Sequence, residues 1–110
     1  LALPRWLAEN PLPVTTVADV VDQIEHIVSV AGIDHVGLGS NFDGIVSVPK
    51  DLDDVSCFPR VTQALLDRGY QPEQIRKILG ENTLRVLRDV ERVAASSQNQ
   101  DGTVVAATGN

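Results

Sequence analysis

The sequence has 110 residues, of which 43% are hydrophobic and 22% are charged, and its formal net charge is -6. The nine Lys and Arg residues are scattered, which argues against nucleic acid as a partner, because phosphate binding needs clustered basic side chains. No apolar run approaches the roughly 20 residues of a membrane helix, and the single Cys57 excludes an internal disulfide.

The start of the chain indicates that it is part of a longer protein. It begins at Leu1 rather than at an initiator Met, it contains no Met, and its opening residues already look like the inside of a structural element. We therefore expect an upstream portion. Any secretory signal would lie there, so the sequence leaves the localisation open among extracellular, membrane-attached and cytoplasmic sites.

A first amphipathic helix is predicted over residues 16–31. Thr15 or Thr16 can cap its start, and the acidic Asp19 suits the positive end of the helix dipole. Gly32 follows the helix as a C-terminal cap. The apolar stripe has three- and four-residue spacing and consists of Val17, Val20, Val21, Ile24, Ile27, Val28 and Ala31.

A buried parallel strand is predicted at about residues 35–40, directly after this helix. The segment from His35 to Ser40 is a short apolar run that is too brief for a helix. A loop from Asn41 to about Ser56 follows, and a loop this long in a compact domain usually has a function. The only other candidate strand, at a sheet edge, is Leu12 to Val14.

Two short helices are predicted after the loop. Pro59 fits the first turn of a helix that runs to Arg68 and is closed by Gly69. Pro72 likewise opens a helix, which we expect Gly80 to end. The two helices meet at residues 69–70.

A last helix is predicted to begin at a cap formed by Asn82 or Thr83 and to fray near Ala95. Arginine and aspartate side chains occupy most of its outer surface. Residues 96–110 have too little apolar surface to offset the entropy of ordering, so we assign them to a disordered tail. The apolar stripe of the helix consists of Leu84, Leu87, Val90 and Val93 or Ala94.

These elements do not make a complete fold. One buried parallel strand needs neighbouring strands that this sequence does not contain. A (β/α)8 barrel needs about 250 residues, and its last strand with the flanking helices would account for the pattern. We therefore assign the chain to the α/β class, as the mostly helical C-terminal segment of a (β/α)8 TIM-type barrel, with residues 1–95 as an incomplete barrel domain.

Alternation along the predicted strand places Asn41 at the mouth of such a barrel. His35, Gly37 and Gly39 share one face with it. The small glycines suit the crowded interior, and Asn41 continues their face at the C-terminal end of the strand, where barrel enzymes carry catalytic groups. Asp43 has the same parity, although alternation is a weak guide in a loop.

At these residues a family resemblance can be stated. The segment from Gly32 to Gly44, which reads Gly-Ile-Asp-His-Val-Gly-Leu-Gly-Ser-Asn-Phe-Asp-Gly, closely resembles the last-strand segment of the membrane (renal) dipeptidase family of zinc metallopeptidases. The resemblance covers about residues 14–92 as one ordered series. The helix from Val17 to Ile27 resembles the family's preceding helix. The remaining matching parts are Leu52 to Ser56, Phe58 and Pro59, Gly69 and Tyr70, and Asn82 to Val86.

The resemblance implies a zinc-dependent dipeptidase. Members of the family are (β/α) barrels that hydrolyse dipeptides with two zinc ions, and their metal ligands come from earlier strands, so no metal ligand is implied in this chain. One position carries over: Asn41 stands where the family normally has an aspartate that handles a proton and contacts the substrate. An amide can hydrogen-bond a substrate but cannot transfer a proton, and losing an acid/base group costs about 10²- to 10⁴-fold in rate.

Other polar residues have simpler interpretations. Asp43 could replace part of the missing carboxylate function, but an Asp near Gly more commonly orders a loop. His35 would lie roughly 20 Å from Asn41, at the opposite end of the strand. Asp51 and Asp53 lack the remaining ligands of a calcium loop.

Three functions stay open. The chain is the C-terminal part of a zinc dipeptidase, inactive by itself; or it belongs to a non-catalytic relative that binds peptide, because Asn41 replaces the usual Asp; or it is a small helical interaction module that folds alone. Rescue of turnover by Asn41→Asp would separate the first two. Substrate preference, zinc occupancy and oligomeric state, a homo-oligomer included, are not readable from the sequence.

Overall fold

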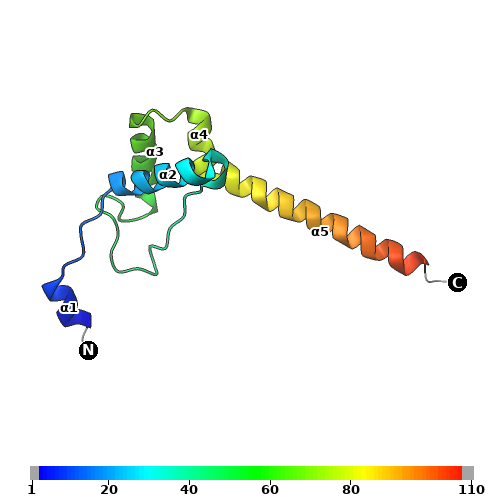
Figure 1. Ribbon diagram of the computed structural model, residues 1–110, viewed down its shortest axis with the longest axis horizontal. Coiled ribbons are helices and arrows are strands. Elements are labelled where there is room, and N and C mark those ends of the chain that lie inside the picture. Colours follow the sequence, from blue (N-terminus) through cyan, green and yellow to red (C-terminus); the bar gives the residue numbers. More distant parts are fainter. Residues whose placement is uncertain (1–2, 108–110) are drawn as a thin grey trace.

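The computed structural model describes residues 3–107, with side chains described for residues 3–99. Its radius of gyration of 21.4 Å is well above the value of about 13 Å expected for a compact domain of this length. The reason is visible in Figure 1: the middle helices cluster together, while the first and the last project away from the cluster. The clustered helices are α2 (Val17–Ala31), α3 (Phe58–Asp67) and α4 (Pro72–Arg76), and the projecting ones are α1 (Leu3–Glu9) and α5 (Asn82–Ala107).

The predicted helix over residues 16–31 is confirmed as α2. The backbone N–H of Thr16 donates to the Asp19 carboxylate at 2.7 Å, and this hydrogen bond lowers the pKa of Asp19. The helix ends at Gly32, whose φ of 89° is a conformation that glycine adopts without strain. The predicted caps at both ends of α2 are therefore present.

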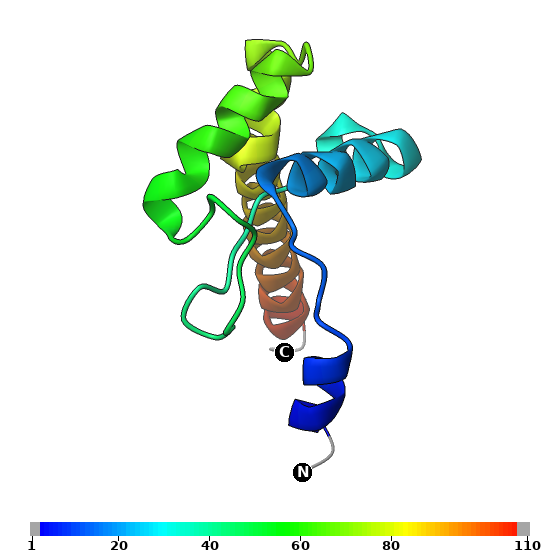
Figure 2. The same ribbon diagram turned by 90° about the vertical axis from the view of Figure 1, so that its left-hand side faces the viewer.

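The hydrophobic core lies where α2 packs across α3 and α4. Figure 2 shows α2 beside α3 and in front of the start of α5. Arg68, just after α3, adds an ion pair to the α2 residues Asp22 at 2.7 Å and Glu25 at 2.5 Å. These partners are partly exposed, so we expect the pairs to orient the helices more than stabilise them. The buried apolar residues are Val21, Ile24, Val36, Leu52, Val61, Leu65, Ile75 and Ile78.

The two helices predicted from Pro59 and Pro72 are also present. The first agrees with α3 to within one residue at each end, and Gly69 after it has a φ of 87°. The predicted interruption at Gly80 is also present. A π-helical turn, Lys77–Glu81, links α4 to α5, and inside it Gly80 has non-helical torsion angles (φ 176°, ψ -27°) that mark a kink between two helices.

The predicted strand at residues 35–40 is not formed. Residues Ile33–His35 make a 3-10 turn, and Val36 has extended torsion angles (φ -122°, ψ 141°), but no β-ladder forms within residues 3–107. Extended backbone becomes a strand only when a neighbouring strand pairs with it. The sole bridge in the described part of the chain is an isolated parallel one between Thr16 and Lys50, and Leu12 to Val14 is likewise unpaired.

The last helix is longer than predicted. It does not fray near Ala95, and residues 96–107 are helical rather than disordered; residues 108–110 lie outside the described part. The prediction weighed apolar surface, whereas no Gly or Pro interrupts residues 82–101, and the helix also continues through Gly102.

The apolar side chains predicted as a stripe on the last helix do not pack. Leu87 is 55% exposed and Val90 is 61% exposed, because α5 extends away from the helical cluster (Figure 1). Between residues 3 and 107, no helix has both the length and the apolar character that a membrane span requires.

Candidate functional site

Asn41 lies at the end of the extended segment that links α2 to the loop. The segment is held to the core at two points: the Val36 side chain is buried, and the Leu38 backbone N–H donates to the Ile78 carbonyl oxygen at 3.1 Å. Three residues beyond that hydrogen bond, the Asn41 side chain is exposed. The neutral Asn41 amide is thus exposed at the end of a backbone segment that Val36 and Leu38 attach to the core.

A tight turn follows at residues 41–44. The Gly44 N–H donates to the Asn41 carbonyl oxygen at 2.9 Å. The Asn41 side chain folds back over Gly44, so that a β-carbon at residue 44 would come within 2.5 Å of Asn41 Nδ2 and 2.7 Å of its Cγ. A side chain at residue 44 would therefore require the exposed Asn41 amide to move from this position.

Asp43 lies in the same turn, and its side chain is exposed. It makes no hydrogen bond or ion pair among the described residues. The expected role of Asp43 in ordering the loop through its side chain is not seen, because the main-chain hydrogen bond between Gly44 and Asn41 closes the turn instead. A free carboxylate and a free amide are thus placed within three residues of each other.

The distal part of the loop is pinned to the helical cluster. The Lys50 N–H donates to the Thr15 carbonyl oxygen at 2.8 Å, and Arg60 Nη1 donates to the Asp51 carbonyl oxygen at 2.7 Å. The Asp54 carboxylate accepts from the Ser56 hydroxyl and N–H, which lowers its pKa and caps the 3-10 turn Val55–Cys57. The loop is fixed along residues 49–57, beyond the turn that carries Asn41.

An apolar pocket of about 170 Å³ lies beside Asn41. One wall comes from the loop and the other from α2 and α3. The rings of Phe42 and Phe58 lie 5.8 Å apart at an angle of 46° across this region. Sequence reasoning missed the pocket, although apolar residues recur every third position in the loop; the loop residues concerned are Phe42, Ile45 and Val48.

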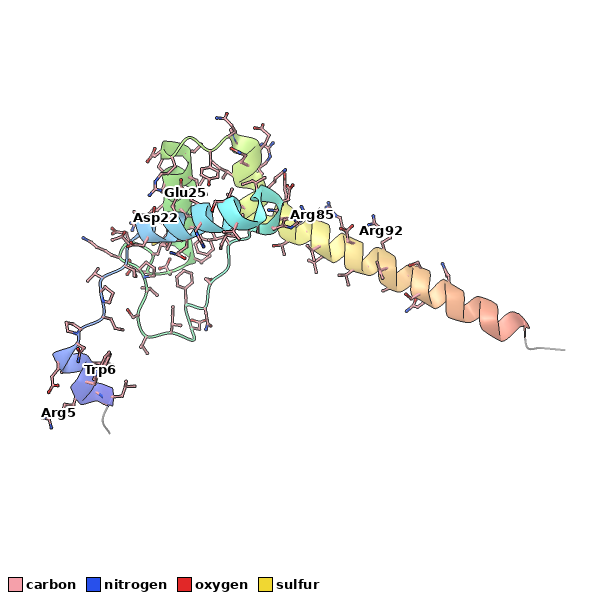
Figure 3. All side chains as sticks on the ribbon, viewed as in Figure 1. Arg5, Trp6, Asp22, Glu25, Arg85 and Arg92 are labelled. Atoms are coloured by element: carbon pink, nitrogen blue, oxygen red, sulfur yellow. The ribbon has the colours of Figure 1, made fainter. Side chains whose placement is uncertain are left out.

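The remaining polar candidates lie away from this turn. His35 is exposed and lines a separate groove of about 240 Å³ with Asp34, Asn82 and Arg85, at the junction of α2 and α5. Figure 3 shows Arg85 at this junction, and it places Trp6 on α1, apart from the helical cluster. The side chains of this groove hydrogen-bond mainly to one another and to backbone carbonyl oxygens, so they connect the end of α2 to the start of α5.

Asn82 is the polar residue with the deepest burial, at 5% exposure. Its amide donates to the carbonyl oxygens of Ile33 at 2.8 Å and Val36 at 2.9 Å. Asn82 therefore acts as a buried hydrogen-bond donor to distant backbone rather than as the predicted helix cap. It ties the start of α5 to the base of the segment that carries Asn41.

The described residues do not fit a zinc site. Among residues 3–99, no group of three or more His, Cys, Asp or Glu side chains is placed to hold a metal ion. Zinc in proteins takes about four ligands, with at least three from side chains. Asn41 and Asp43 can offer hydrogen bonds to a substrate, but with the other described residues they do not make up such a ligand set.

The sequence model of the family described as membrane dipeptidase, peptidase family M19, matches residues 4–101 of the chain. The chain belongs to this family. The match includes the segment Gly32 to Gly44 and the loop after it, so the turn that carries Asn41 is part of the shared sequence. The resemblance first stated on these residues is thereby confirmed.

Three curated fungal members of the family are similar to the chain. It is 47% identical over 93 residues to dipeptidase tcpJ of Claviceps purpurea, which is 84% of this chain and 22% of that protein. It is 50% identical over 91 residues to dipeptidase ataJ of Aspergillus terreus, with 83% and 22% covered. It is 49% identical over 93 residues to dipeptidase aclJ of Aspergillus oryzae, again with 84% and 22% covered. The chain thus spans about a fifth of the length of these relatives.

Proposed function

We propose that the chain contributes the substrate-facing turn of a zinc-dependent dipeptidase, as the last part of its (β/α)8 barrel. Membership of the membrane dipeptidase family supports the reaction class. The observation that carries the proposal is the exposed Asn41 amide on an anchored extended segment, at the position where the resemblance implies a substrate contact. The extended but unpaired backbone of residues 36–40 suits a strand whose neighbours belong to the rest of such a barrel.

The zinc of this proposal is held by residues other than those described, and its contribution is an activated water for attack on the peptide carbonyl. The contribution of this chain is orientation. The Asn41 amide can donate to a carbonyl oxygen or accept from an ammonium group, and a dipeptide substrate carries both. Asp43 adds a carboxylate, which is suited to the positively charged amino end of a dipeptide.

A second candidate is a relative that binds peptide without cleaving it. One observation favours it: residue 41 is an amide, and an amide cannot accept and return a proton during the reaction. Asp43 lies within the same turn, so it is the group available to replace the lost carboxylate. The two candidates differ in turnover and share the binding site.

The test is made on the full-length gene product, with its zinc content measured by mass spectrometry and hydrolysis measured on a panel of dipeptides. The dipeptidase predicts bound zinc and turnover, and an Asp43→Asn variant should lower turnover if Asp43 replaces the family carboxylate. The binding relative predicts zinc without turnover, and turnover gained in Asn41→Asp by about 10²-fold or more. If neither the unmodified protein nor Asn41→Asp binds zinc or hydrolyses a dipeptide, the dipeptidase proposal is contradicted.

A further inference from the structure

The pocket beside Asn41 has the character of a binding site for a small apolar group. No charged side chain lines it, and its polar contribution comes from Asn41 and Ser40 at the rim. Its volume of about 170 Å³ is below the range of about 300–1,000 Å³ that is typical for whole ligands. The volume instead suits one amino-acid side chain.

We propose that this pocket is a subsite for an aliphatic side chain of the substrate, which makes the protein selective for dipeptides that carry a residue such as leucine. The inference rests on the proposed function and deepens it. Asn41 lines the pocket, and its side chain is exposed to solvent. The same ligand can therefore bond its main-chain polar groups to the amide while its side chain enters the pocket.

The inner wall of the pocket is rigid. It is formed by Leu52 and Val61, which are 5% and 0% exposed, together with Val20 of α2. These residues belong to or pack against the hydrophobic core, where side chains are closely packed and cannot easily give way. A ligand side chain therefore meets a surface of fixed shape.

The outer wall comes from the loop, chiefly from Ile45 and Val48. Ile45 is 46% exposed, whereas its neighbour Val46 is 108% exposed and does not line the pocket. The loop is fixed just beyond this wall by the hydrogen bond from Lys50 to Thr15. Ile45 and Val46 thus form a matched pair of adjacent apolar residues, of which one contacts the pocket.

The chemistry of the lining sets the direction of selectivity. A charged side chain that entered the pocket would lose its water without gaining a partner, which is costly. An aliphatic side chain gains by leaving water, and differences of one methylene group in hydrophobic pockets correspond to about 10-fold or more in kcat/KM. The expected order is therefore leucine above alanine, with lysine and aspartate lowest.

The experiment uses the full-length gene product and two substrate pairs, Leu-Gly with Ala-Gly and Gly-Leu with Gly-Ala. Hydrolysis is followed as kcat/KM, and binding of the same peptides is measured by calorimetry. The unmodified protein should favour leucine over alanine by about 10-fold or more in one pair. Ile45→Ser should reduce that preference several-fold by lowering the value for the leucine peptide, whereas Val46→Ser should leave both values unchanged.

The possible outcomes separate the subsite from the reaction. Hydrolysis with equal kcat/KM for leucine and alanine in both pairs keeps the dipeptidase and overturns the subsite. Equal effects of Ile45→Ser and Val46→Ser on the preference overturn it as well. If no peptide is cleaved, the proposed reaction fails. The subsite is then still supported if a leucine peptide binds more tightly than its alanine counterpart and only Ile45→Ser weakens that binding. Equal binding of the leucine and alanine peptides overturns the subsite.

Discussion

The amide of Asn41 lies where a β-carbon on residue 44 would be, so that a methyl group on residue 44 and the present position of the amide exclude each other. The pair is held by the main-chain hydrogen bond between the same two residues. Whatever Asn41 does for a substrate therefore depends on a glycine three residues away.

Gly44→Ala should displace the Asn41 side chain and lower kcat/KM of the full-length protein by about 10- to 100-fold, because misplacement of a substrate-orienting group by about 1 Å can cost as much. Steady-state kinetics on a dipeptide measures the effect. If Gly44 acts through Asn41, adding Gly44→Ala to Asn41→Ala should cost little more. Ser47→Ala, in an exposed position of the same loop, is the control, and an additive double variant would contradict the argument.

Asn82→Ala should destabilise the fold by about 1–3 kcal/mol, because the carbonyl oxygens of Ile33 and Val36 would lose their amide donor in a buried place. Urea denaturation measures the change. Asn10 is a matched control, since its amide also donates to a backbone carbonyl, that of Trp6, but in an exposed position. Asn10→Ala should change the free energy of unfolding by less than about 0.5 kcal/mol, and equal losses in the two variants would refute the role of Asn82.

Leu65→Ala should cost about 2–5 kcal/mol of stability, because Leu65 is fully buried between α2 and α3 and its removal leaves a cavity. Its neighbour Leu66 is 44% exposed, so Leu66→Ala should cost clearly less. Thermal and urea unfolding of both variants give the comparison. A similar loss at both positions would mean that the interface between α2 and α3 is not the core of this fold.

Asp34 should make stability depend on pH at the acid end. Its hydrogen bond and ion pair with Lys77, at 2.6 Å, hold its pKa below the ordinary value of 3.8. A lowered pKa in the folded state stabilises the fold above the ordinary value, and this contribution disappears as the pH falls through the lowered one.

Asp34→Asn should therefore reduce the free energy of unfolding at neutral pH, and the difference from the unmodified protein should vanish below the lowered pKa. Urea denaturation across the acid range measures this. Asp53→Asn serves as control, because the Asp53 side chain makes no hydrogen bond or ion pair among the described residues. A difference between Asp34→Asn and the unmodified protein that is constant with pH would contradict the assignment.

Local signals predicted α2 and α3 well, because their caps and prolines act within a few residues. The hydrogen bond between Thr16 and Asp19 joins residues three positions apart, and Pro59 lies in the first turn of α3. Such interactions involve residues that are close together in the sequence. They depend on no distant part of the chain.

Other features depend on parts of the chain that lie far apart in the sequence. The strand at 35–40 was inferred from apolar content, but strand formation requires a partner backbone, which no local pattern can supply. Asn82 was correctly singled out, but its role is set by carbonyl groups 46 and 49 residues away.

The candidate site was only partly predictable. Asn41 and Asp43 were found from alternation and from a resemblance, and both lie exposed at the predicted end of the segment. The apolar pocket was missed because its two walls come from a loop and from helices that meet only in the folded chain. The proximity of Asn41 to Gly44 was missed too, since it depends on the side-chain rotamer.

The bond between Lys50 and Thr15 connects two events that would otherwise be independent. Thr15 immediately precedes the first turn of α2, so local melting of that turn and release of the loop should occur as one opening reaction. The Lys50 amide then exchanges its hydrogen at the rate at which the N-terminus of α2 frays. The hydrogen bond from Lys50 to Thr15 thus ties the loop that shapes the pocket to the end of α2 that is capped by Thr16 and Asp19.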